Sequence, residues 1–218
     1  MRAWNEVDRT QVPGGVELRL MERGHEFSIM SGSIELMNSR RGRSEQQLAV
    51  LAAERVGAAN RARVLIGGLG MGFTLRSALE HFPPDSEIVV AELVPAVIAW
   101  ARGPLADVHG QSLDDPRVTL VEGDVADQIR DGGAFDAILL DVDNGPDGLT
   151  RADNDGLYSP GGLAGAKAAL RRGGILAIWS ADPDARFLRL LNMSGFAAEE
   201  VRIRAGGARH VVWLGRRN

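Results

Sequence analysis

From residue 63 onward, short uninterrupted apolar runs alternate along the chain with segments of helical periodicity. Runs of this kind indicate strands that are buried on both faces, as in a parallel sheet covered by helices. The expected strands are Val64–Ile66, Ile88–Ala91, Val118–Val121, Ala137–Leu140 and Ile175–Trp179. The sequence therefore predicts an α/β fold built on a doubly wound, mostly parallel Rossmann-like sheet.

Helical patterns occupy the segments between these strands. They cover Phe73–Phe82, Val94–Arg102 and Gly161–Leu170, and prolines follow the first. The last of the three is expected to end at the segment 171–174, which contains two arginines and two glycines.

The C-terminal part of the chain changes character. A helix is expected over Ala185–Met193, and strands over Ala198–Arg204 and His210–Leu214 flank the pair Gly206-Gly207, which predicts an antiparallel hairpin. A parallel sheet that finishes in such a hairpin resembles the class I methyltransferase fold rather than a simple dehydrogenase domain.

The first 42 residues form a separate pattern. The apolar-rich runs Val16–Met21, Glu26–Met30 and Ile34–Met37 are separated by glycine- and serine-containing turns. We expect a small antiparallel β-meander over residues 1–42, followed by the main domain over residues 43–218. Ser44 and Gln47 have the spacing of a capping box, so a helix should begin there and end near Gly57.

Composition limits the classes of protein to consider. A length of 218 residues suits one α/β domain with a small appendage, and a net charge of −4 gives no reason to expect a nucleic-acid partner. There are no cysteines, which excludes disulfides and thiolate metal ligands, and the histidines are scattered, so no metal site is expected. No apolar run approaches the roughly 18 residues that span a bilayer. We expect a soluble cytoplasmic protein with no membrane partner.

A glycine-rich turn follows the first strand of the main domain. Gly68, Gly70 and Gly72 have the spacing G-x-G-x-G, and Gly67 precedes them. Glycines here let a ligand approach the backbone at the carboxyl edge of the sheet. The dinucleotide fingerprint would need a third glycine at position 73, where Phe73 stands. The four glycines are candidate cofactor-binding residues, and a tight turn without a ligand is the alternative.

Three acidic residues follow successive strands. Glu92 is placed to accept hydrogen bonds from ribose hydroxyls, Asp124 to meet an adenine amino group, and Asp141 to lie beside a sulfonium. Each acid alone would more often be a turn or cap residue than a ligand. Their joint position beside a glycine loop predicts an adenosyl-sulfonium cofactor. Leu93 and Val125, the next residues along the chain, are further candidates for binding it.

With these motifs, the chain resembles the spermidine synthase (polyamine aminopropyltransferase) family of the S-adenosylmethionine-dependent methyltransferase superfamily. The resemblance implies transfer from S-adenosylmethionine or decarboxylated S-adenosylmethionine to a small amine, without a metal. It also implies that Asp141 helps to deprotonate the attacking amine, and that the N-terminal meander forms a homodimer interface. The matching segments are Ile66–Gly72, Glu92–Ile98, Gly123-Asp124, Phe135–Asp141 and Gly173–Leu176.

The acceptor side of the family pattern is altered. The second aspartate and the proline after Asp141 have a different spacing, and residues 44–47 stand where the family has a tyrosine–histidine pair. Asp143, in an acidic segment, and Tyr158 are candidate substrate-binding residues. The alternatives are a solvated acidic loop for the former and a packing role for the latter.

Three functions remain open from the sequence. The first is a spermidine synthase-like transferase in polyamine biosynthesis, and the second is a methyltransferase acting on a small molecule. The third is a non-catalytic binding or dimerisation module that keeps the fold.

Overall fold

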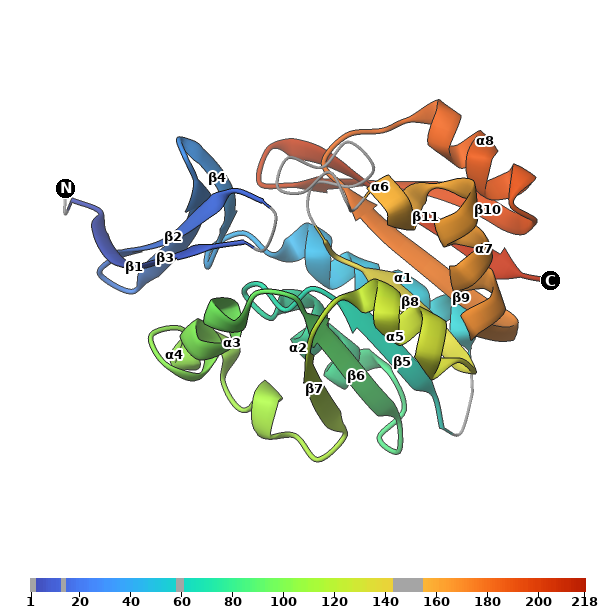
Figure 1. The fold of residues 1–218 in the computed structure, drawn as a ribbon, viewed down its shortest axis with the longest axis horizontal. Helices are drawn as coiled ribbons and strands as arrows, with labels where there is room; N and C mark the ends of the chain where they lie inside the picture. Colours follow the sequence, from blue (N-terminus) through green and yellow to red (C-terminus); the bar gives the residue numbers. More distant parts are fainter. Residues whose placement is uncertain (1–2, 13–14, 58–60, 143–154) are drawn as a thin grey trace.

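The computed structural model describes residues 3–12, 15–57, 61–142 and 155–218, which form two sheets (Figure 1). A four-stranded antiparallel sheet lies beside the seven-stranded sheet of the main domain. The last strand of the small sheet ends at Asn38 and the first helix begins at Arg43. The division of the chain into domains at residue 42 stays a prediction.

The small sheet has the order β1-β2-β3-β4. The sequence predicted three of its strands and missed β1. That strand has one apolar residue, Val7, and its side chains are almost all exposed, so it is held by backbone pairing to β2 and leaves no apolar pattern. The strands are β1 (Asn5–Gln11), β2 (Glu17–Arg23), β3 (Glu26–Ser31) and β4 (Ile34–Asn38).

Helix α1 (Arg43–Val56) connects the two sheets, and its predicted capping box is wrong. The N-cap is Gly42, and the hydroxyl of Ser44 donates to the Glu45 carboxylate instead of to the backbone. A side chain at position 42 would meet the ring of Phe73 at 2.1 Å, so close packing against α2 requires glycine there. The predicted end at Gly57 is confirmed, since its N–H bonds the carbonyl of Ala53.

The seven-stranded sheet has the order β10-β11-β9-β8-β5-β6-β7. The five strands from β5 to β9 pair in parallel, and β11 pairs antiparallel with both β9 and β10. The predicted fold class is therefore confirmed, including the terminal hairpin. The strands are β5 (Arg63–Gly67), β6 (Glu87–Glu92), β7 (Val118–Glu122), β8 (Phe135–Leu140), β9 (Leu170–Ser180), β10 (Phe196–Ala205) and β11 (Ala208–Arg217).

Helices cover both faces of this sheet (Figure 1). Side chains alternate between two buried clusters. Val64 and Ile66 contribute to one cluster, whereas Leu65 contributes to the other, and all three are fully buried. Burial on both faces explains the uninterrupted apolar runs. The remaining helices are α2 (Phe73–His81), α3 (Pro95–Arg102), α4 (Ala106–His109), α5 (Val125–Gly132), α6 (Asp155–Tyr158), α7 (Pro160–Ala169) and α8 (Ala185–Met193), with a 3₁₀ turn at Ser112–Asp114.

Two helix predictions need correction. Helix α5 was not expected, because it has only eight residues, and two buried positions one turn apart, Val125 and Ile129, are too few to establish a helix from the sequence. Residues 171–174 do not follow α7 as a loop, because β9 already begins at Leu170, which pairs with Phe135 of β8.

Candidate active site

The glycine loop between β5 and α2 lies at the carboxyl edge of the sheet. Gly68, Gly70 and Gly72 have φ angles of +92°, +47° and +72°. A side chain at Gly68 would come within 2.4 Å of the carbonyl oxygen of Asp141. Glycine at position 68 therefore permits both the backbone conformation and the close approach between this loop and the end of β8.

Glu92 ends β6 and supports the same loop. Its carboxylate accepts hydrogen bonds from the N–H groups of Leu69 and Val94, each at 2.9 Å. Burial raises the pKa of Glu92, and these backbone donors partly oppose that shift. Because Val94 is the N-cap of α3, the sequence alternative of a helix-terminal carboxylate is also correct. Glu92 nevertheless lines the pocket described below.

Asp124 and Val125 lie after β7. Asp124 caps α5, and its Oδ1 accepts a hydrogen bond of 2.9 Å from the N–H of Ala126. Both residues line the pocket, and a side chain at Gly67 would meet Val125 at 2.9 Å. The capping role is thus observed, whereas contact with a cofactor stays a prediction for both residues.

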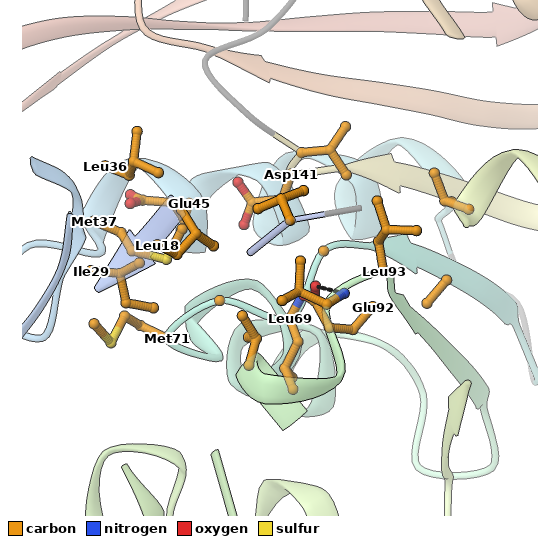
Figure 2. A pocket seen from close by; sticks show the side chains of 18 of the residues that line it. Leu18, Ile29, Leu36, Met37, Glu45, Leu69, Met71, Glu92, Leu93 and Asp141 are labelled. Atoms are coloured by element: carbon orange, nitrogen blue, oxygen red, sulfur yellow. Dashed lines mark hydrogen bonds between the residues drawn. The ribbon is translucent and has the colours of Figure 1, made fainter. Parts of the chain in front are cut away.

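Asp141 follows β8 and reaches into the pocket (Figure 2). The hydroxyl of Thr74 donates to its Oδ2 at 2.6 Å. Burial, together with the negative charge of Glu45, raises the pKa of Asp141 to about 7, although the Thr74 hydrogen bond acts in the opposite direction. A carboxyl group that titrates near neutral pH can both accept and release a proton under physiological conditions.

Glu45, in the first turn of α1, is a pocket residue that the sequence analysis missed. Figure 2 shows its carboxylate reaching into the same pocket as that of Asp141. The hydroxyl of Ser44 donates to its Oε2 at 2.5 Å. The available signal is an acid in the segment where the family has its tyrosine–histidine pair, but the spacing of Ser44 and Gln47 predicts only a helix cap there.

The pocket lies between the two sheets. Of the predicted cofactor-binding residues, Gly68, Gly70, Glu92, Leu93, Asp124 and Val125 line it, as does the predicted catalytic residue Asp141. Among the lining residues that the structure describes there is no lysine, arginine or histidine. The other described lining residues are mostly apolar: Val12, Leu18, Ile29, Leu36, Met37, Leu69, Met71, Phe73, Ala91, Val94, Val97, Val142 and Trp179, together with Gly123 and Glu45.

Gly67 and Gly72 lie behind this lining. A side chain at Gly72 would come within 2.5 Å of Nδ1 of His109, whose Nε2 lies 3.2 Å from the carbonyl oxygen of Gly70. Burial lowers the pKa of His109 to about 4, with the charge of Arg76 acting in the same direction. A neutral His109 on α4 therefore packs against the glycine loop and supports its conformation.

The two predicted substrate-binding residues have different outcomes. Tyr158 is buried, its hydroxyl donates to the carbonyl of Val142 at 3.3 Å, and its ring packs edge-on against Phe187. The packing alternative is thus observed, Tyr158 is not one of the pocket-lining residues, and its contact with substrate stays a prediction. Asp143 lies outside the described residues.

The described parts of the chain hold neither a candidate metal site nor a membrane-spanning helix. Within residues 3–12, 15–57, 61–142 and 155–218, no three histidine or acidic side chains are grouped so as to hold a metal ion. In the same ranges, no helix has the length and apolar character needed to cross a membrane.

Comparison with curated proteins identifies relatives that share about half of the chain. A polyamine aminopropyltransferase of Mycobacterium tuberculosis (strain H37Rv) is 37% identical over 124 residues, which is 55% of this chain and 23% of that protein. Polyamine aminopropyltransferase 1 of Hyperthermus butylicus is 35% identical over 121 residues, 54% of this chain and 40% of that protein. The matched segment thus spans less than half the length of either relative. No family model matches the chain.

Solved structures resemble the chain over nearly its whole length. Spermidine synthase from Thermotoga maritima superimposes with a TM-score of 0.78 at 18% identity, covering 98% of this chain and 73% of that one. A spermidine synthase in complex with the transition state analogue AdoDATO gives 0.76, with 98% and 72% covered at 18% identity. The predicted resemblance is confirmed: the homologues are aminopropyltransferases, and the fold is the methyltransferase-like fold of spermidine synthase.

Proposed function

We propose that the chain is a transferase that moves an aminopropyl group from decarboxylated S-adenosylmethionine to a small amine. The observation that carries this proposal is one continuous pocket that joins the glycine loop and Glu92 to the carboxylates of Asp141 and Glu45. The names of the homologues and the fold support the same reaction class.

The cofactor end of the pocket suits an adenosyl group. Gly68 and Gly70 line this end, and the absence of side chains lets their loop pack closely against Asp141 and Met37. Glu92 lines the same end, and a carboxylate there suits ribose hydroxyls as a hydrogen-bond acceptor. Leu93 and Val125 provide apolar contacts for a flat base, while Asp124 provides an acceptor for its amino group.

The charges in the pocket favour the decarboxylated donor. Glu45, Glu92, Asp124 and Asp141 all line it, and none of the described lining residues is basic. S-Adenosylmethionine carries a carboxylate that would find no cationic partner among these residues, at a cost in desolvation and repulsion. Its decarboxylated form carries only positive charges, so the same pocket attracts it.

In the mechanism we propose, Asp141 takes the proton that frees the acceptor's lone pair. The amine nitrogen then forms a bond to the carbon next to sulfur as the carbon–sulfur bond breaks, and the bonding pair remains on sulfur. A bound sulfonium supplies an electrophilic carbon with a neutral thioether as its leaving group. The Thr74 hydrogen bond fixes the Asp141 carboxylate, so orientation and proton removal supply the acceleration.

A homodimer and a cytoplasmic location belong to the same proposal. The small sheet is the proposed dimer interface because the family resemblance implies it. Val7 and Ile34, on its two edge strands, are its exposed large apolar side chains among the described residues, with 40% and 47% exposed.

Calorimetric titration with each donor, followed by turnover with an amine, tests the proposed reaction. We expect the decarboxylated donor to bind at least about tenfold more tightly than S-adenosylmethionine, since even one unpaired buried carboxylate costs that much.

Asp141→Asn should leave donor affinity nearly unchanged and lower kcat by roughly 10²- to 10⁴-fold. Preference for S-adenosylmethionine would instead indicate methyl transfer, and binding of neither compound would indicate a non-catalytic module.

A further inference from the structure

The two carboxylates of the acceptor end are fixed in place by buried hydroxyl groups. Ser44, 4% exposed, donates to Glu45 at 2.5 Å, and Thr74, 2% exposed, donates to Asp141 at 2.6 Å. Thr74 Oγ1 also lies 3.2 Å from the backbone carbonyl oxygen of Glu45, so one side chain connects α1, α2 and the end of β8. Two fixed carboxylates without a basic neighbour in the described lining suit the binding of an ammonium group.

The wall beyond Glu45 is apolar. Figure 2 shows Asp141 between the cofactor side of the pocket and Glu45, whose side chain lies next to a group of apolar side chains from the small sheet. We call this group the apolar wall; it consists of Leu18 on β2, Ile29 on β3, and Leu36 and Met37 on β4. The small sheet lies directly on the glycine loop, since a side chain at Gly70 would meet the sulfur of Met37 at 2.9 Å.

The charged residues of the small sheet near this wall are engaged elsewhere. Glu35 accepts hydrogen bonds from Ser28 at 2.9 Å and from Asn38 at 2.8 Å, and it does not line the pocket. Glu26 pairs with Arg23 at 2.6 Å. A second ammonium placed against the apolar wall would therefore lose its hydration without gaining a partner, whereas an alkyl group would gain from burial there.

We propose that the acceptor is a primary amine with an apolar body, whose single ammonium lies between Glu45 and Asp141 while its body contacts the apolar wall. This inference rests on the proposed aminopropyl transfer and specifies the substrate class of that site. It assigns Glu45 as an acceptor-binding residue. The transfer itself proceeds as above: nitrogen bonds to carbon, the carbon–sulfur pair goes to sulfur, and the proton goes to Asp141.

A matched pair of amines tests the proposal on the full chain with the decarboxylated donor. Hexylamine and pentane-1,5-diamine have the same number of heavy atoms and differ only in a terminal methyl or ammonium group. We expect kcat/KM to be at least about tenfold higher for hexylamine, because the diamine would bury an unpaired charge. A higher kcat/KM for the diamine would overturn the proposal.

Substitution of the wall should reverse this preference. Leu36 is half-buried on the edge strand β4, so Leu36→Glu is compatible with the fold and places a carboxylate where a diamine's second ammonium would lie. We expect the ratio of the two kcat/KM values to shift about tenfold toward the diamine. Leu36→Gln, equal in size and uncharged, is the control and should not favour the diamine. An unchanged ratio in a folded Leu36→Glu protein would contradict the assigned wall.

Glu45→Gln tests the ammonium site separately. We expect a rise of about tenfold in the KM for hexylamine, with a much smaller change in the calorimetric affinity for the donor. An unaltered KM would remove Glu45 from acceptor binding. Donor titration and turnover together separate the substrate class from the reaction itself. Donor binding with a preference for the diamine would overturn only the substrate class. No turnover with either amine would overturn the aminopropyl transfer as well.

Discussion

At the scale of single residues, the proposed chemistry depends on an Asp141 carboxyl group whose pKa lies near neutral pH. Burial and the Glu45 charge make the ionised form of Asp141 costly, and one hydroxyl, that of Thr74, stabilises it. The other titratable groups that line the described pocket, Glu92 and Asp124, are also acidic. The base is thus active when deprotonated, and its pKa sets the acidic limb of the rate profile.

Glu45→Gln should move that limb to lower pH. Removal of the neighbouring negative charge makes ionisation of Asp141 easier, so its pKa falls from about 7, by roughly 0.5–1 unit. The measurement is kcat/KM from pH 5 to pH 9. Thr74→Val is the control, because loss of the stabilising hydroxyl should raise the pKa of Asp141. The acidic limb of the kcat/KM profile should then move to higher pH. A common shift in one direction for both variants would contradict this account.

Asp141→Asn should stabilise the folded protein above neutral pH. The carboxyl ionises near pH 3.8 when unfolded, whereas its pKa in the folded state is about 7. Between these values the folded state binds more protons, so the free energy of unfolding falls as pH rises from about 4 to about 7. Asparagine does not ionise and so avoids this loss. We expect the Tm of the Asp141→Asn protein at pH 8 to exceed that of the natural chain by roughly 2–4 °C. The gain should shrink at pH 5, and an equal gain at both pH values would indicate another cause.

At the scale of elements, the strands of the main sheet could be predicted from the sequence because burial on both faces leaves an apolar run. Elements that satisfy only the backbone leave no such pattern. For that reason β1 was missed, since Val7 is its only apolar residue. Helix α5 was missed for another reason, because it has only eight residues and buries only Val125 and Ile129. The position of Asp141 follows from the end of its strand, but the position of Glu45 beside it depends on how α1 packs. His109 was missed for the same reason, because its contact with the glycine loop is made by tertiary packing.

Gly68→Ala should disrupt the site through the backbone. The left-handed conformation strains any side chain, and a Cβ would lie 2.4 Å from the carbonyl oxygen of Asp141, so the loop or the end of β8 must move. We expect a loss of about 1–3 kcal/mol of stability and at least a tenfold loss of donor affinity. Denaturant unfolding and calorimetry measure the two effects.

Gly161→Ala is the matched control for this substitution. Gly161 lies in α7, where a Cβ meets only the Ser159 hydroxyl at an ordinary 3.7 Å. Alanine should be neutral or slightly stabilising in a helix. A Gly68→Ala protein as stable as the Gly161→Ala protein, with undiminished donor affinity, would show that the close approach at position 68 is not required.

At the scale of the whole molecule, the pocket exists because the small sheet is attached to the main domain. The indole N–H of Trp100 on α3 donates to Asp8 on β1 at 2.6 Å, and this bond lowers the pKa of Asp8. Met37 of β4 lies against the glycine loop. Cofactor residues and the apolar wall thus come from different sheets, and no local sequence pattern could have shown that they share one pocket.

The proposed homodimer places the outer part of the small sheet in the interface. If two chains pair there, Ile34→Glu would bury an unpaired charge at the contact and should dissociate the dimer, since such a charge costs several kcal/mol. Met193→Glu is the control, because Met193 is 85% exposed on α8 of the main domain. Light scattering coupled to size-exclusion chromatography should show a dimer for the natural chain and the control, and a monomer for Ile34→Glu. A monomeric natural chain would contradict the dimer, and a dimeric Ile34→Glu protein would place its interface elsewhere.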